Sequence, residues 1–161
     1  CDCLIAERID PVVTSRTRKK LTKASRYLLF DTGVARVAAR EGRLLPRARM
    51  GELFEQFVGI EIVRHCRLHA PEARLRFWRD PDGPEVDWVV DYPGGFLPIE
   101  VKLGDRPSER DARHVEVFIE EYGARRGLVV CSVPRPMKLT PRVTAVPWQE
   151  LPEVLRSALS R

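Results

Sequence analysis

Residues 84–102 read PEVDWVVDYPGGFLPIEVK, and this stretch decides the fold that we expect. Two strand-like runs, residues 85–92 and 96–103, flank a Pro-Gly-Gly turn signal at 93–95. Alternating apolar residues around such a turn predict a β-hairpin. The rest of the chain can be placed relative to this hairpin.

The expected register brings three charged side chains together. A hairpin centred on the turn places Asp87 opposite Glu100, and strand alternation puts Glu100 and Lys102 on one face. Opposed carboxylates repel one another, so a compensating charge is required: a divalent cation, or the Lys102 ammonium. The apolar strands favour the middle of a sheet, where bare charge is costly, over a solvated outer face. A register slip of one residue would separate Asp87 from Glu100.

Length and charge set the broad class. The chain has 161 residues, of which 43% are hydrophobic, enough for one domain with a buried core. Its net charge is +5, from 28 Lys and Arg against 23 Asp and Glu, which suits a nucleic-acid partner. Basic residues concentrate between positions 16 and 49, so this segment is either a phosphate-binding face or a solvated linker.

The cysteines argue against a zinc site, because the four lack paired C-x-x-C spacing. Cys1-Asp2-Cys3 alone is a weak metal signal, and Cys66 and Cys131 are expected to be buried thiols of a reduced protein. No signal peptide and no apolar run of membrane-spanning length is visible. We therefore expect a cytoplasmic protein without a membrane partner. The chain lacks an initiator Met and is expected to be a fragment.

Two segments are expected. Residues 1–45 form a basic N-terminal segment with a short strand or helix tail at 3–13, a basic loop at 15–23, a strand at 27–30 and a helix at 34–39. A strand, a basic tip and a second strand would match the wing of a winged-helix module, so this segment is interpreted as a winged-helix remnant.

Residues 46–161 form an α/β domain with sharper patterns. A helix at 50–69 ends before Pro71, and a helix at 108–125 begins with Ser108 as its N-cap. An unbroken apolar run at 128–132 indicates a buried strand. The remaining expected elements are strands at 75–79 and 142–146 and a helix at 148–159.

The order helix, three-stranded meander, helix, strand, with P-E-V-D at 84–87 and I-E-V-K at 99–102, resembles the PD-(D/E)xK nuclease superfamily. The resemblance implies a restriction-endonuclease-like core and hydrolysis of nucleic-acid phosphodiesters. The sequence departs from the usual pattern in having two residues between Pro84 and Asp87.

A second resemblance covers almost the whole chain. The chain is similar to the C-terminal domain of unknown function carried by many prokaryotic AAA-type P-loop ATPases. This resemblance implies an upstream ATPase, through which ATP would act, and a winged-helix region; the chain itself has no G-x-x-x-x-G-K-[ST] motif. The signatures are R-Y-L-L-F-D-T-G-V at 26–34, M-G-E-L-F-E-Q-F-V at 50–58, F-W-R-D at 77–80, E-V-D-W at 85–88 and P-I-E-V-K at 98–102.

The nuclease resemblance assigns four site residues: Glu55, Asp87, Glu100 and Lys102. Asp87 and Glu100 would bind Mg²⁺ (or Mn²⁺), a hard cation that prefers carboxylate oxygens, and Glu55 would add a ligand through water. The metal would lower the pKa of a bound water and neutralise charge on the phosphate. Lys102 would orient that water or stabilise the transition state.

Other assignments compete with these. Glu52 and Glu61 are alternatives to Glu55 on the same helix, and Glu85 could pair with Lys102 in place of a metal. The histidines lie apart from the hairpin and are expected on the surface: His65, His69 and His114.

Three functions remain open from the sequence. The first is a Mg²⁺-dependent nuclease, with DNA favoured over RNA, working with an ATPase domain of the same polypeptide. The second is an inactive nuclease-fold module that binds DNA or a protein partner for the ATPase. The third is a protein-interaction domain that needs no metal. Whether the chain is an enzyme, and whether it forms an oligomer, is left open.

Overall fold

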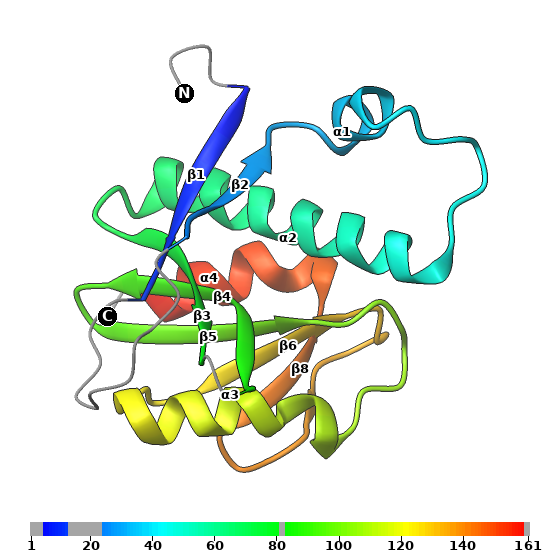
Figure 1. Ribbon diagram of the computed structural model, residues 1–161. Helices are drawn as coiled ribbons and strands as arrows, with labels where there is room; N and C mark the ends of the chain where they lie inside the picture. Colours follow the sequence, from blue (N-terminus) through cyan, green and yellow to red (C-terminus); the bar gives the residue numbers. More distant parts are fainter. Residues whose placement is uncertain (1–4, 13–23, 81–82, 160–161) are drawn as a thin grey trace.

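A mixed, eight-stranded sheet runs through the molecule in the order β2-β1-β3-β4-β5-β6-β8-β7 (Figure 1). The structure is a computed structural model that describes residues 5–12, 24–80 and 83–159. The predicted basic loop at 15–23 and the Cys1-Asp2-Cys3 signal lie outside these residues. The strands are β1 Ala6–Pro11, β2 Arg26–Leu29, β3 Arg74–Arg79, β4 Glu85–Tyr92, β5 Gly95–Val101, β6 Gly127–Cys131, β7 Met137–Lys138 and β8 Val143–Pro147.

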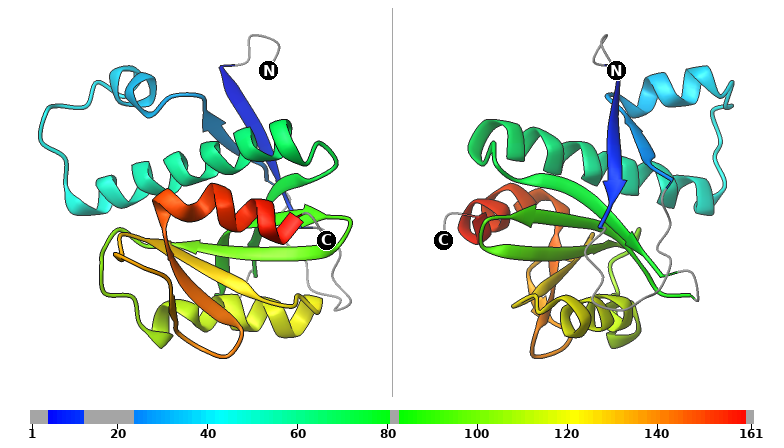
Figure 2. Two further views of the ribbon diagram at one scale, coloured as in Figure 1. Left: turned by 180° about the vertical axis from the view of Figure 1, so that it is seen from behind. Right: turned by 60° about the vertical axis from the view of Figure 1, so that its left-hand side comes forward.

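Helices cover both faces of this sheet (Figures 1 and 2). In the described residues these are α1 Thr32–Ala38, α2 Arg47–His69, α3 Glu109–Tyr122, the 3-10 turn η1 Trp148–Glu150 and α4 Leu151–Leu159. The helices α2 and α4 lie together on one face, whereas α3 lies on the other. None of the described helices is long and apolar enough to cross a membrane.

The central hairpin has the predicted register. The strands β4 and β5 pair antiparallel, from Trp88 opposite Ile99 to Tyr92 opposite Gly95, and continuing this register places Asp87 opposite Glu100. The strand β5 ends at Val101, earlier than predicted. The next backbone N–H, that of Lys102, donates to the Val130 carbonyl oxygen of β6 at 2.9 Å.

Alternation along the strands builds the two core layers. On β6, Leu128 and Val130 pack towards α2 and α4, whereas Val129 and Cys131 pack towards α3. All five residues of this strand are buried, as its unbroken apolar run predicted. The buried states predicted for Cys66 and Cys131 are also confirmed.

The ends of α3 follow from local chemistry. Ser108 caps the helix in a reciprocal capping box with Asp111, which confirms the predicted start. The helix ends earlier than predicted because Gly123 takes a left-handed conformation, with φ of 69°.

The N-terminal strands join the same sheet. The strands β1 and β2 pair antiparallel, and β1 pairs parallel with β3 through Asp10 opposite Arg76 and Pro11 opposite Phe77. The division of the chain at residue 45 and the winged-helix interpretation of the first segment stay predictions.

Candidate active site

The middle of α2 sits directly on β4 because residue 59 is glycine. A Cβ atom at Gly59 would lie 2.8 Å from the ring of Trp88, which is closer than side chains pack. The buried Trp88 indole N–H donates to the Glu55 carbonyl oxygen at 3.1 Å. This contact holds Glu55, one helical turn before Gly59, over the start of β4.

The hairpin carries two carboxylates beside this position. An oxygen of Asp87, Oδ2, accepts the backbone N–H of Val101 at 2.8 Å. Glu100 is only 6% exposed, and its Oε1 lies 2.7 Å from the Lys102 Nζ. Its other oxygen, Oε2, is buried without a hydrogen-bond partner. A buried, unpartnered carboxylate oxygen is costly.

The electrostatics show that the three carboxylates share one environment. Burial, followed by the charge of Asp87, raises the pKa of Glu55 to about 7 and that of Glu100 to about 7. Burial also raises the pKa of Asp87, although the Val101 N–H and Lys102 oppose the shift. Burial lowers the pKa of Lys102, but its hydrogen bond to Glu100 and the nearby acidic charges outweigh this and raise it. The four predicted residues are therefore brought together.

Arg26 of β2 also belongs to this site, and sequence reasoning did not assign it there. One guanidinium nitrogen lies 3.2 Å from Glu55 Oε1, and the other lies 3.7 Å from Glu85 Oε2. The guanidinium stacks over the Phe77 ring at 4.5 Å. Arginine 26 stands 29 positions before Glu55, and no local pattern signals a pair of this kind.

Two expectations require correction. Glu85 pairs with Arg26 and Arg79, at 3.7 and 3.5 Å, and its predicted alternative partner Lys102 pairs with Glu100. His65 is 7% exposed and not a surface residue, because it lies on the buried side of α2 with Ile62 and Cys66. The competing acids of α2 bind elsewhere: Glu52 pairs with Arg49, and Glu61 pairs with Arg64.

The fit of these residues to a metal ion is partial. Within residues 5–12, 24–80 and 83–159, no group of three or more His, Cys, Asp or Glu side chains is placed to hold a metal ion. The buried, unpartnered Glu100 oxygen next to Asp87 does suit a cation. In the structure, Lys102 and Arg26 supply positive charge beside the carboxylates. Of the two compensating charges left open by the sequence, the lysine is therefore present.

A hollow adjoins the carboxylate cluster, formed by Glu55, Asp87 and Glu100, on the α2 side. Its volume is about 320 Å³, and its lining includes Arg26, Glu52, Glu55, Gln56 and Trp88. Pockets of roughly 300–1,000 Å³ accommodate small ligands or parts of larger ones. Glu55 and Arg26 are thus reachable from outside.

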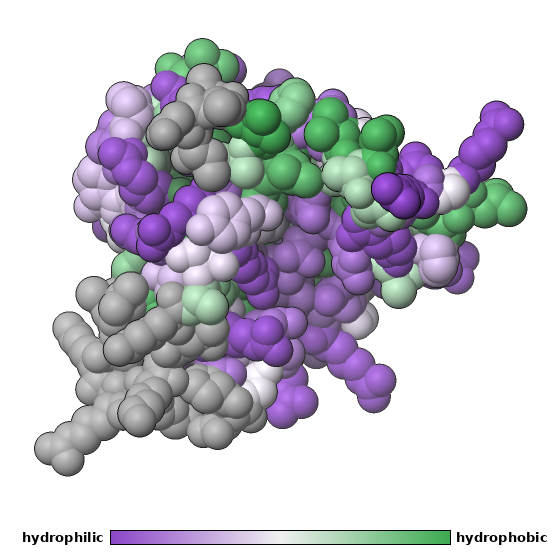
Figure 3. Space-filling view, turned by 45° about the horizontal axis from the view of Figure 1, so that its top comes forward, coloured by the Kyte–Doolittle hydropathy of each residue, from purple (hydrophilic) through white to green (hydrophobic). Residues whose placement is uncertain are grey.

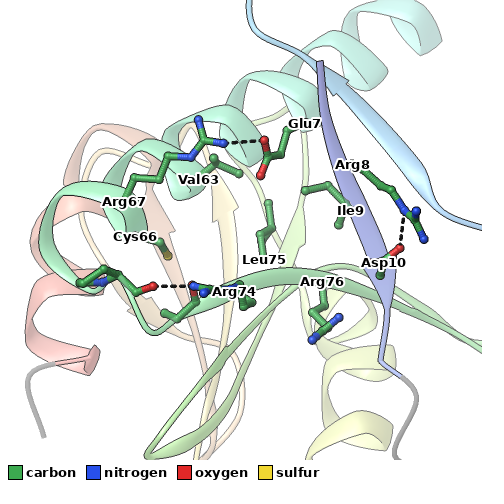
Figure 4. Close-up of a pocket in the computed structure, with 12 residues that line it drawn as sticks. Glu7, Arg8, Ile9, Asp10, Val63, Cys66, Arg67, Arg74, Leu75 and Arg76 are labelled. Carbon is green, nitrogen blue, oxygen red and sulfur yellow. Dashed lines mark hydrogen bonds and ion pairs between the residues drawn. The ribbon is translucent and has the colours of Figure 1, made fainter. Parts of the chain in front are cut away.

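A second cavity, of about 370 Å³, lies away from this cluster, between β1, β3 and the C-terminal half of α2 (Figure 4). Ion pairs of Arg67 with Glu7, at 2.6 Å, and of Arg8 with Asp10, at 2.9 Å, lie along its wall. None of the four predicted site residues lines it, so its size does not make it the candidate active site.

Comparison with known proteins gives a family and a distant structural likeness. A family described as "Domain of unknown function (DUF4143)" matches residues 50–151. No curated protein matches the chain. The structure of Pyrococcus furiosus SfsA in complex with Ca²⁺ is similar at 18% identity and a TM-score of 0.30, over 88% of this chain and 63% of that chain.

The chain thus spans less than two thirds of that structure's length, and a likeness this low supports no conclusion on fold or activity. The family match, in contrast, extends over more than half of the chain and contains Glu55, Asp87, Glu100 and Lys102. The chain belongs to the DUF4143 family, whose function is unknown.

Proposed function

We propose that residues 46–161 form a restriction-endonuclease-like domain that hydrolyses phosphodiester bonds of nucleic acid, with DNA favoured over RNA, in the presence of Mg²⁺ or Mn²⁺. The observation that carries the proposal is the opposition of a half-buried Asp87 and a buried Glu100, one of whose carboxylate oxygens has no hydrogen-bond partner. Burying like charges in this way destabilises a fold. Such an arrangement is typical of a site that serves chemistry.

Each carboxylate would have a separate role that depends on its surroundings. Asp87 and Glu100 would hold the cation, and Glu55 would contribute through a water. When bound, the cation supplies a nucleophilic water at neutral pH and neutralises charge on the phosphate. Glu55 borders the open hollow and has a pKa of about 7, which suits a group that accepts a proton near neutral pH.

Two cations of the chain would act on the substrate. Lys102 is 44% exposed although it pairs with Glu100, so its ammonium can reach a phosphate while it holds the carboxylate. Arg26 lines the hollow, and a guanidinium binds phosphate oxygens in a bidentate manner. The net charge of +5 favours an anionic polymer as substrate.

The test is cleavage of supercoiled plasmid, labelled duplex, branched DNA and single strands with Mg²⁺, Mn²⁺ or no metal. Cleavage by the wild-type chain should be lost in Asp87→Asn and in Lys102→Ala. Glu52→Gln is the matched control, because Glu52 lines the same hollow but pairs with Arg49 outside the cluster. Activity that survives Asp87→Asn would refute the assignment.

A second function has support from the same site. Lys102 and Arg26 already balance the carboxylates, and no ready three-ligand group exists in the described residues. These facts favour an inactive nuclease-fold module that binds DNA or a protein partner for an ATPase domain of the same polypeptide. DNA binding that needs no metal and persists in Asp87→Asn and Lys102→Ala would support this module.

A further inference from the structure

Exposed apolar side chains gather on one segment, residues 27–50, which we name the α1 arm. Ten large hydrophobic residues are exposed in the described part of the chain, and six of them belong to this arm. Leu44 is 95% exposed and Val37 is 78% exposed. Scattered exposed hydrophobics are ordinary, but a gathered set marks an interaction surface. The six are Tyr27, Phe30, Val34, Val37, Leu44 and Met50.

The helix of the arm has little core to hold it. Helix α1 has seven residues, and only Ala35 is buried. Val34 and Val37, three positions apart, share one face of the helix and are both exposed. A helix this short is marginal in water without packing against something. Figure 1 shows α1 and the loop after it projecting beyond the body of the domain.

Polar contacts nevertheless fix the shape of the arm. Asp31 caps α1 by accepting the Val34 N–H at 2.9 Å, and Arg36 donates to the Gly42 carbonyl oxygen at 2.8 Å. Glu41 pairs with Arg36 and Arg49. The apolar face is therefore presented by a segment that its own hydrogen bonds and ion pairs hold together.

Most of the exposed charges on the arm are positive. Arg40, Arg43 and Arg47 are exposed and form no ion pair with any residue that the structure describes. The acids of the arm are engaged in the cap and in the Glu41 pairs. Figure 3 shows hydrophobic and strongly hydrophilic residues side by side over this part of the molecule.

We propose that the α1 arm is a docking surface for an acidic amphipathic helix of a partner protein. The apolar face of such a helix would cover Val34, Val37 and Leu44, while its carboxylates would meet the exposed arginines of the arm. A second copy is disfavoured because an isologous contact would oppose the same arginines. Nucleic acid alone would leave the apolar face uncovered. The proposal does not depend on the candidate active site.

The probe is a fluorescently labelled synthetic helix of leucine and glutamate at amphipathic spacing. Its scrambled isomer has the same composition without the apolar face. The peptide should bind the wild-type chain and the isomer should not. Val37→Ser and Leu44→Ser should each weaken binding about tenfold. Arg43→Glu should weaken it further and reduce its salt dependence.

The matched controls are Leu68→Ser and Met137→Ser, which change exposed hydrophobics outside the arm. They should leave binding unchanged, and amide shifts on peptide addition should be confined to residues 27–50. Equal binding of the isomer, equal losses in the controls, self-association through the arm, or preferred binding to duplex DNA or anionic phospholipid vesicles would each overturn the proposal.

Discussion

The carboxylate cluster and the α1 arm reverse the usual placement of side chains in opposite ways. The cluster places the half-buried Asp87 and the buried Glu100 in the sheet, where apolar residues would be more stable. The arm exposes Val37 and Leu44 to water, where polar residues would serve equally well. Burying a charge lowers the free energy of unfolding, whereas exposing apolar surface leaves the stability of the isolated fold almost unchanged. Stability measurements should therefore separate the two regions.

Lys102→Met should give the largest effect. It leaves Glu100 buried opposite Asp87 without its 2.7 Å ion pair. Breaking a buried pair from one side costs several kcal/mol, and screening at the partly exposed lysine reduces this to about 2 kcal/mol. Urea unfolding at pH 8 measures the loss. Lys138→Met, at an exposed lysine of β7, is the control, and an equal loss there would contradict the account.

The pH dependence of stability is the second test. Burial raises the pKa values of Glu55 and Glu100 in the folded state to about 7, against 4.5 for an ordinary glutamate. Between these values the folded state binds more protons than the unfolded state, so stability falls as pH rises from about 4.5 to about 7. Each group contributes on the order of 2 kcal/mol.

Glu100→Gln isolates this contribution. It should flatten the pH profile and make the chain more stable than wild type at pH 8, because one of two opposed charges is gone. The difference between variant and wild type, followed by urea unfolding from pH 5 to pH 8, cancels the titration of groups that do not interact with Glu100. A variant less stable than wild type at pH 8 would show that the buried charge of Glu100 does not destabilise the fold.

The close packing of α2 against β4 gives the third test. Gly59→Ala places a methyl group against the Trp88 ring and should destabilise the chain by about 1–2 kcal/mol. It should also displace Glu55, seen as a change in the Glu55 pKa by NMR. Gly51→Ala in the same helix meets no atom within 4 Å and should stabilise by about 0.5–1 kcal/mol. Equal signs for the two variants would rule out the close contact.

The smallest effect is expected in the α1 arm. Val37→Ser and Leu44→Ser should change the free energy of unfolding by less than about 0.5 kcal/mol, because both side chains are already in water. Thermal melts of the isolated chain check this. A loss near that of Lys102→Met would mean that the arm packs against the body, and the contrast between the regions would fail.

The sequence was most informative where neighbours in the chain are also neighbours in space. The Pro-Gly-Gly turn and the alternation beside it predicted the register that opposes Asp87 and Glu100. Ser108 predicted the start of α3, and the unbroken run of β6 predicted its burial on both faces.

Pairs formed across the fold could not be predicted in this way. Arg26 reaches Glu55 and Glu85 only after β2 has been placed in the sheet. The burial of His65 depends on how α2 is rotated against α4, and a helical pattern with apolar residues on several faces does not fix that rotation. The exposure of the apolar residues of the arm could not be predicted either, because it depends on which parts of the fold pack against the arm and which do not.

Manganese titration by calorimetry at pH 8, above the pKa values of about 7 in the cluster, addresses the central claim directly. One binding site is predicted in the wild-type chain and in Glu52→Gln, with loss of that site in Asp87→Asn and in Glu100→Gln. A wild-type chain that binds no manganese, or a site that persists in both hairpin variants, would contradict the claim that these hairpin carboxylates hold a cation.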